Sequence, residues 1–269
     1  MNLAKQKIGF LGTGKMATAL AEGFVAGPLD GSQIVGVDPV EAAQKSFEQA
    51  VSGAQTGADA ALLKNCDVVF LAVKPQVLPS VLTAVQSHLA GGKLIVSIAA
   101  GVRMQKLQGW LPEDARLIRV MPNTPCLIGK GASGVSRSES ATTKDEELVC
   151  ELLQGVGIVE RVSEPLLEAL TGLSGSGPAY VFQIIEALSD GGVNVGLPRA
   201  TATRLAAQTL LGAAELVLQT GEHPAALKDA VTSPGGTTIA GLQAMEQGGV
   251  RAALMNAVQL AVERGQQLG

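Results

Sequence analysis

The chain has 269 residues, of which 46% are hydrophobic but only 3% aromatic, so its core must be built mainly from Ala, Val, Leu and Ile. This length suits one large domain or two modest ones. With 20 basic residues against 24 acidic ones, a net charge of −4 and no long basic run, the composition disfavours a nucleic-acid partner.

Residues that commonly bind metals are few and scattered: His88, His223, Cys66, Cys126 and Cys150. A structural zinc site needs clustered thiolates or imidazoles, so we expect no metal. Scattered cysteines are typical of free thiols in a reducing cytoplasm. The first residues lack the apolar core of a signal peptide, and the longest uncharged stretch, 75–92, is interrupted by proline and polar residues. We therefore expect a cytoplasmic protein that does not enter a membrane.

The first 162 residues alternate short apolar runs with longer stretches such as 17–25 and 77–89, which are long enough for helices. This alternation predicts an α/β fold: a Rossmann-type, doubly wound parallel sheet with helices on both faces, forming a domain over residues 1–162. The runs predicted as strands buried on both faces are Lys7–Leu11, Ile34–Val37, Val68–Val73, Leu94–Ile98 and Leu117–Met121.

A glycine-rich segment lies between the first predicted strand and the first predicted helix. Gly12-x-Gly14-x-x-Ala17 matches the dinucleotide-binding fingerprint with Ala as its third small residue. Gly12 allows a tight turn, Gly14 lets the backbone approach a pyrophosphate, and the following helix offers its free N–H groups to the phosphates. A magnesium-dependent phosphate loop is the alternative, but it fails because Met16 stands where Ser or Thr is needed.

Asp38 ends the second predicted strand, some two dozen residues beyond the glycines. An acidic residue there can accept a hydrogen bond from a ribose 2′-hydroxyl and would repel a 2′-phosphate. The alternative is that Asp38 and Pro39 start a turn and cap the next helix. Under the first interpretation, NADH should compete well with NADPH.

Beyond about Val162 the strand-like runs stop and the sequence predicts an all-helical domain over residues 163–269. Predicted helices cover 180–189, 198–219, 239–247 and 250–264. They are rich in Ala and apolar on more than one face, which indicates contact with another subunit. The alternative is an ordinary monomeric bundle.

Several segments together resemble the pyrroline-5-carboxylate reductase family, in the right order and over essentially the whole chain. The resemblance implies that NADPH or NADH reduces 1-pyrroline-5-carboxylate to L-proline, the last step of proline biosynthesis. It also implies homodimers that interlock through the C-terminal helices. Five such dimers can form a decamer. The segments are the glycine loop, Val68–Pro75, Met121–Pro125, Leu170–Tyr180 and Leu227–Thr238.

The resemblance also implies which residues hold the cofactor. The glycine loop would hold the pyrophosphate, while Ala100 and Gly101 would lie beside the nicotinamide. Asp59 departs from the Asn of many members, and this second carboxylate would disfavour a 2′-phosphate. Ala230 likewise replaces a polar residue of some members. The full set is Leu11, Gly12, Thr13, Gly14, Lys15, Met16, Asp38, Asp59, Val73, Lys74, Pro75, Ala100, Gly101 and Asn123.

Lys74 also has a simpler interpretation, that of a solvated lysine at a strand end. Its predicted place at the carboxyl end of a strand, where open α/β sheets bind ligands, favours a role at the site.

The segment Ser233–Thr238 leads into the predicted helix 239–247. Glycines before a helix N-terminus expose N–H donors and form an anion site, which suits a substrate carboxylate. Helix capping by Ser or Thr is the alternative. By the resemblance this loop comes from the partner subunit, and we expect Thr238 to donate a hydrogen bond to the ring nitrogen. The residues expected to bind substrate are Glu164, Ser233, Gly235, Gly236, Thr237 and Thr238.

Glu164 could equally be a solvated carboxylate at a helix start. Among other functions, a β-hydroxyacid dehydrogenase would need a catalytic Lys and an Asn, where this sequence has Val181 and Ile185. A reductase of other cyclic imines and a dinucleotide-binding sensor without turnover also remain as alternatives, because a fold alone does not decide function.

Overall fold

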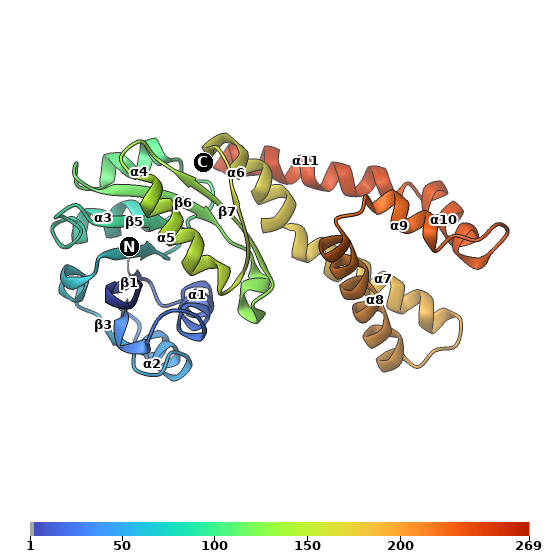
Figure 1. The fold of residues 1–269 in the computed structure, drawn as a ribbon, viewed down its shortest axis with the longest axis horizontal. Coiled ribbons are helices and arrows are strands. Elements are labelled where there is room, and N and C mark those ends of the chain that lie inside the picture. The colour runs from blue at the N-terminus through green and yellow to red at the C-terminus, as the bar shows by residue number, and fades with distance from the viewer. Residues whose placement is uncertain (1–2, 269) are drawn as a thin grey trace. The chain divides into compact units, whose positions relative to one another are not determined.

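The computed structural model describes residues 3–268, which divide into two compact units. The first unit comprises Met1–Ser176 with Leu260–Gly269, and the second comprises Gly177–Gln259. Figure 1 draws both along the chain, and each unit is described below by itself.

The first unit is built on an eight-stranded sheet in the order β3-β2-β1-β4-β5-β6-β7-β8. Pairing is parallel throughout except between β6 and β7. Ile8 at the start of β1 pairs with Ile34 on one side and with Val68 on the other. The strands are β1 (Ile8–Leu11), β2 (Ile34–Val37), β3 (Gln55–Gly57), β4 (Val68–Leu71), β5 (Leu94–Ser97), β6 (Arg116–Met121), β7 (Gly131–Arg137) and β8 (Gly157–Arg161).

Helices cover both faces of this sheet, as the alternation of elements predicts (Figure 1). One hydrophobic core joins the sheet to α1 (Lys15–Ala26), α2 (Glu41–Ala50) and α5 (Thr143–Gln154). The other joins it to the 3-10 helix η3 (Ala60–Asn65), α3 (Leu78–Val85) and α4 (Met104–Trp110).

Aromatic side chains are rare in this protein, and four of its five phenylalanines meet in one core. The rings of Phe10 and Phe70, on neighbouring strands, stack with centroids 5.1 Å apart. Phe24 and Phe47 join them from α1 and α2. This cluster fixes β1 and β4 beneath α1, so it supports the turn that carries the glycines.

The unit continues through α6 (Glu164–Leu170) and the π-helical turn η6 (Thr171–Gly175). The sequence places a domain boundary at 162/163, whereas the compact units part after Ser176. The physical reason for this difference is that α6 packs against β6 and β7. The first unit also includes the end of α11 (Val250–Leu268), from Leu260 onwards.

The second unit is helical: α7 (Gly177–Asn194), α8 (Arg199–Thr220), α9 (Pro224–Ala230), α10 (Thr237–Gln247) and the first part of α11. The helices predicted from the sequence are all present, with α10 beginning two residues earlier than expected. α7 and α8 lie side by side and are joined by Ser189 Oγ and Thr203 Oγ1 at 2.7 Å (Figure 1).

Many large apolar side chains of the second unit are exposed. Phe182 is 64% exposed and Leu218 is 68% exposed. Others on these helices are Val181, Leu188, Leu205, Leu211, Leu216, Ile239, Met245, Leu254 and Met255. Among the described helices, none combines the length and apolar character needed to cross a membrane.

Candidate active site

The turn between β1 and α1 needs glycine at its first position. Gly12 has φ +98°, and a Cβ there would lie 2.9 Å from the carbonyl oxygen of Ala72. Any side chain would therefore strain the backbone and collide with the segment after β4. The N–H of Gly12 donates to the carbonyl of Val37 at 2.7 Å, which fixes the turn against β2.

Gly14 serves a different purpose, because a Cβ at this position would meet no atom within 4 Å. Gly14 is the N-cap residue of α1, and no side chain caps that helix. The helix N-terminus is thus left open to an anion. Beside it, Thr13 is 2% exposed, and its Oγ1 is a buried oxygen without a hydrogen-bond partner. An open glycine cradle beside an uncapped helix fits a dinucleotide pyrophosphate.

Asp38 follows β2, and both of its carboxylate oxygens accept backbone hydrogen bonds. Oδ2 accepts from the N–H of Thr13 at 2.9 Å and Oδ1 from the N–H of Val40 at 2.9 Å. The predicted turn is therefore present, but Asp38 does not cap α2, whose N-cap residue is Val40. The carboxylate instead ties the glycine turn to the end of β2, and each oxygen keeps a further lone pair for a ligand hydroxyl.

Asp59 lies near the same corner of the sheet. Val37 and Gly57 are register partners on β2 and β3, and the N–H of Asp38 donates to the carbonyl of Gly57 at 3.1 Å. Asp59 is exposed and caps η3 by accepting from the N–H of Ala61 at 2.8 Å. Two carboxylates thus follow adjacent parallel strands.

The segments after β4 and β5 lie along the same edge, because these strands are parallel to β1. Lys74 is exposed, while Val73 and Pro75 are half-buried. Gly101 has φ +75° and turns the chain after β5. A cavity of about 170 Å³ is lined by Pro75, Gln76, Ala100, Gly101, Val102, Lys106 and Trp110.

Asn123, after β6, is 7% exposed, and both ends of its side-chain amide bond to backbone groups. Its Nδ2 donates to the carbonyl of Ser174 at 3.0 Å, and its Oδ1 accepts from the N–H of Ala132 at 2.9 Å. Asn123 therefore joins β6 to β7 and to η6, and holds the edge of the sheet in place.

The predicted substrate loop, Ser233–Thr238, belongs to the second unit. Gly235 has φ +67°, which requires glycine, and a Cβ at Gly236 would lie 2.3 Å from Ser233 Oγ, so a side chain there would displace the Ser233 hydroxyl. Gly236 is the N-cap residue of α10, and no side chain caps this helix. The interpretation of the loop as a Ser or Thr cap is therefore wrong. The first N–H groups of α10 are thus left without a side-chain cap.

Glu164, the first residue of α6, is not a solvated carboxylate. Its Oε1 accepts from the N–H of Met104, the first residue of α4, at 2.6 Å, and from Arg119 Nη1 at 2.6 Å. Arg119 comes from β6 and is 5% exposed. Glu164 thus binds three elements together beside a cavity of about 200 Å³ that it lines with Arg103, Arg119 and Glu168.

This chain is similar to known proteins over nearly its whole length. A family model described as "Pyrroline-5-carboxylate reductase dimerisation" matches residues 164–268, and one described as "NADP oxidoreductase coenzyme F420-dependent" matches residues 7–101. The pyrroline-5-carboxylate reductase of Methanosarcina acetivorans is 44% identical over 268 residues, which is 99% of each chain. The chain belongs to the pyrroline-5-carboxylate reductase family.

Further members of this family are also similar to this chain over nearly its whole length. The pyrroline-5-carboxylate reductase of Arabidopsis thaliana is 46% identical over 263 residues, 97% of this chain and 95% of that protein. The crystal structure of the Plasmodium falciparum enzyme, with NADP bound, has a TM-score of 0.88 at 32% identity and covers 99% of each chain. The Coxiella burnetii structure reaches a TM-score of 0.92 at 35% identity over 98% of each chain.

The resemblance drawn from the sequence is thus confirmed, together with the Rossmann-type and helical architecture. The chain is an oxidoreductase of the pyrroline-5-carboxylate reductase family. This membership decides against a β-hydroxyacid dehydrogenase. The dimerisation match begins at residue 164, close to the boundary expected from the sequence.

The buried ion pairs of Arg119 were not predicted from the sequence. Its Nη2 lies 3.5 Å from Glu168 Oε1, in addition to the contact of Nη1 with Glu164. Arg119 lies more than 40 residues before the two glutamates of α6, so no local spacing links it to them. The signal available was an arginine in the middle of an apolar strand, because a charge buried in a sheet requires a partner.

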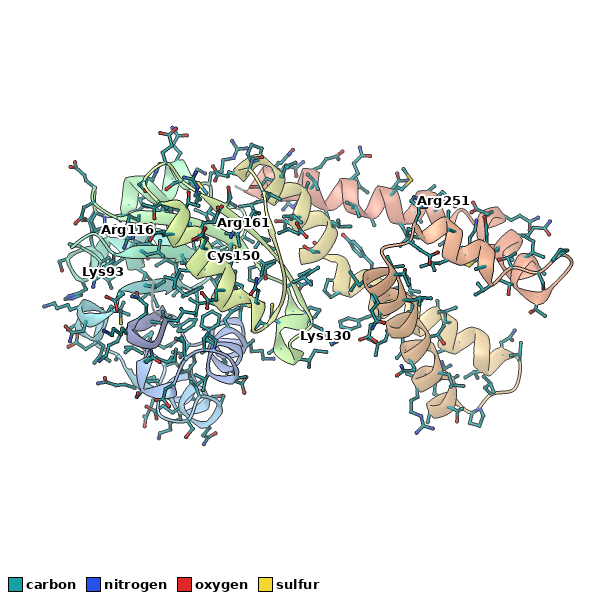
Figure 2. The ribbon with its side chains drawn as sticks, viewed as in Figure 1. Lys93, Arg116, Lys130, Cys150, Arg161 and Arg251 are labelled. Carbon is teal, nitrogen blue, oxygen red and sulfur yellow. The ribbon has the colours of Figure 1, made fainter. Side chains whose placement is uncertain are left out.

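The cysteines are buried thiols without disulfide bonds. Burial raises the pKa of Cys66 to about 11, and it also raises the pKa of Cys126. Cys150 lies on α5 and accepts a hydrogen bond from Arg161 Nε at 3.5 Å (Figure 2). Within residues 3–268, no three His, Cys, Asp or Glu side chains gather into a candidate metal site.

Proposed function

We propose that this chain catalyses the NAD(P)H-dependent reduction of 1-pyrroline-5-carboxylate to L-proline, the last step of proline biosynthesis. The observation that carries the proposal is full-length membership of the reductase family. Open space at Gly14 and the uncapped start of α10 support it.

The cofactor would be held along the carboxyl edge of the sheet. The turn from Leu11 to Met16 would take the pyrophosphate at the open N-terminus of α1, since Gly14 leaves room there. Val73, Lys74 and Pro75 would line the cleft, with Ala100, Gly101 and Asn123 toward the nicotinamide. When bound, the reduced nicotinamide supplies a hydride, that is, a proton with two electrons.

Recognition of the substrate carboxylate would fall to the loop before α10. Ser233, Gly235, Gly236 and Thr237 shape an uncapped helix start, whose N–H groups and positive dipole end favour an anion. Thr238 is half-buried in the first turn of α10. Its hydroxyl can donate to the ring nitrogen or accept from it.

The chain's residues need only orient the two rings and keep or supply one proton at the ring nitrogen. As the C=N carbon gains the hydride, the π electrons pass to the nitrogen, which ends as a secondary amine. Placing the rings face to face accounts for most of the acceleration. A hydrogen bond from Thr238 would strengthen as charge changes at the nitrogen.

NADH is the better cofactor in this proposal. Asp38 and Asp59 follow adjacent strands, and a 2′-phosphate placed there would meet two negative charges. Asp38 is held in place by Thr13 and Val40, so it cannot turn away without breaking two hydrogen bonds.

The working unit would be a homodimer formed through the C-terminal helices, with decamers as a higher assembly. Exposed apolar residues on α7, α8 and α11 support an interface there, as does the match to a dimerisation family over residues 164–268. In this arrangement the loop before α10 serves the cofactor cleft of the partner subunit. The buried free thiols suit a reducing cytoplasm.

The function is tested by incubating the purified protein with 1-pyrroline-5-carboxylate and either cofactor. We expect one L-proline, identified by mass spectrometry, for each NADH or NADPH oxidised, with the faster rate for NADH. Cofactor binding without oxidation would contradict the proposal and favour a reductase of other cyclic imines or a sensor.

A further inference from the structure

Glu168 lies one helical turn beyond Glu164 on α6 but is held differently. Glu164 accepts two hydrogen bonds at 2.6 Å, whereas Glu168 Oε1 lies 3.5 Å from Arg119 Nη2. Glu168 is nevertheless buried, with 9% of its surface exposed. A buried carboxylate with so loose an ion pair is costly unless a cation approaches it.

Glu168 lines two cavities, and the larger one provides room for such a cation. It measures about 330 Å³ and lies within the first unit. A water molecule takes up roughly 30 Å³, so the cavity exceeds what ordered water requires and accommodates a small ring. It is lined by Ala100, Gly101, Glu168, Thr171, Ser176, Ala261, Arg264 and Gly265.

The position of this cavity relates it to the reaction. Ala100 and Gly101 follow β5, in the half of the sheet beyond β4, where a Rossmann fold carries the second nucleotide of a dinucleotide. Glu168 thus shares a cavity with the residues proposed to lie beside the nicotinamide. A Cβ at Gly265 would lie 3.9 Å from Glu168 Oε2, so this glycine leaves space at the second oxygen.

The charged groups around Glu168 come from several elements. Arg119 on β6 is shared with Glu164, and Arg103 borders the smaller cavity. Arg264 on α11 borders the larger cavity and donates to Gln267 Oε1 at 3.0 Å. The larger cavity therefore presents one carboxylate and one guanidinium, which suits a small molecule that carries both charges.

We propose that Glu168 binds the positively charged ring nitrogen of the protonated cyclic imine, and of the secondary ammonium product. This inference rests on the proposed function. A carboxylate at that nitrogen favours its protonated form, and a protonated C=N accepts hydride more readily. The nitrogen keeps its proton and takes the π electron pair when the carbon gains the hydride, which gives a neutral secondary amine. This amine takes a second proton from water to become the ammonium product, so Glu168 itself is unchanged.

Binding of two product-like ligands tests this role apart from turnover. L-Proline carries the ring nitrogen, whereas tetrahydrofuran-2-carboxylate has an uncharged oxygen in its place. Titration calorimetry on the protein loaded with oxidised cofactor should show that Glu168→Gln weakens proline binding about tenfold or more. Binding of the oxygen analogue should stay within about twofold of wild type. Equal losses for both ligands, or no loss for proline, would overturn the proposal.

Activity provides a second test with a readout that a purely structural role would not move. In Glu168→Gln, kcat/KM should begin to fall at a lower pH than in the wild type, because the imine must then hold its proton without help. An unshifted profile counts against the role. Glu151→Gln, on the exposed face of α5, is the matched control and should leave both readouts unchanged.

Folding and the underlying function are checked separately. Glu168→Asp retains the charge, so it should still favour proline over the oxygen analogue even if Glu168→Gln is unstable. Loss of this preference in a folded Glu168→Asp protein would contradict the proposal. A wild type that neither reduces the imine nor binds proline refutes the proposed function, whereas an active wild type with an unaltered Glu168→Gln refutes only the role of Glu168.

Discussion

At the scale of single residues, the hydroxyl of Thr238 is the side chain that our account places at the reacting nitrogen. Thr238→Ala removes one hydrogen bond that strengthens in the transition state, so kcat should fall about tenfold or more. NADH binding should stay near normal. Initial rates and equilibrium titrations on the same preparation provide both values.

A matched threonine controls for damage to the loop. Thr232 Oγ1 donates to the carbonyl of Lys228 at 2.6 Å, so its hydroxyl is engaged within the chain. Thr232→Ala should leave kcat within about twofold of wild type, because no substrate contact is lost. An unchanged kcat in Thr238→Ala would remove Thr238 from its role.

Asp38 determines the cofactor preference in our account. Asp38→Ser removes a negative charge from the corner where a 2′-phosphate would lie, so the ratio of kcat/KM for NADPH over NADH should rise about tenfold. The substitution also loosens the glycine turn, since Thr13 and Val40 both donate to this carboxylate. NADH binding should therefore weaken at the same time.

The control for Asp38 is Asp30, another turn aspartate, whose Oδ1 accepts from the N–H of Ser32 at 2.9 Å. Asp30→Ser removes a comparable hydrogen bond in a turn and should not alter the ratio of kcat/KM for NADPH over NADH. If the ratio does not move in Asp38→Ser either, Asp38 faces away from the ribose.

Sequence alone was a good guide to residues whose role depends on backbone conformation. Gly12 and Gly235 are required by positive φ. The spacing of the dinucleotide fingerprint indicated Gly12, and the family resemblance indicated Gly235. Sequence alone was a poor guide to side chains whose partners come from distant elements. Glu164 was expected in the substrate pocket, but nothing local revealed that it binds Arg119 and the start of α4.

At the scale of elements, the five apolar strands predicted from the sequence are all present. Three strands were not predicted: β3 has only three residues, and β7 and β8 contain a smaller share of large apolar residues than the predicted strands. β7 is mostly buried, but it is built from Gly, Ala and Ser with one Val and a terminal exposed Arg137, so no apolar run marks it. Its antiparallel pairing with β6 also depends on tertiary contacts, such as those of Asn123, which a local pattern does not contain.

The turn between β1 and α1 makes a prediction at this scale. Gly14→Ala should fold normally, because a Cβ would enter open space, yet it should weaken NADH binding about tenfold or more by obstructing the pyrophosphate. Trp110 is the single tryptophan and lines a cavity with Ala100 and Gly101, so quenching of its fluorescence reports NADH binding.

Gly212→Ala, in α8, is the control, because a Cβ there also meets no atom within 4 Å. It should bind NADH as the wild type does and melt at the same or a higher temperature. Normal NADH affinity in Gly14→Ala would contradict the placement of the pyrophosphate.

At the scale of the whole molecule, we propose that each active site is built from two chains. Thr238→Ala leaves a sound cofactor cleft, and Gly14→Ala leaves a sound loop. If the loop serves the partner's cleft, co-expression of the two variants should restore activity to about a quarter of wild type, since half of the dimers are mixed and each of those has one complete site.

Light scattering during size-exclusion chromatography should show dimers or larger assemblies in the same samples. No gain in activity from purified mixed dimers would mean that loop and cleft work within one chain. Unfolding would not explain either result, because both variants are chosen to remain folded.

The central claim is that this reductase acts on a cyclic imine that carries a carboxylate. The most direct measurement compares kcat/KM, from the loss of NADH absorbance, for 1-pyrroline-5-carboxylate and for 1-pyrroline, which lacks the carboxylate. Charged hydrogen bonds at the start of α10 predict a preference of about a hundredfold for 1-pyrroline-5-carboxylate. Equal rates for the two imines, or no NADH oxidation with either, would contradict the account.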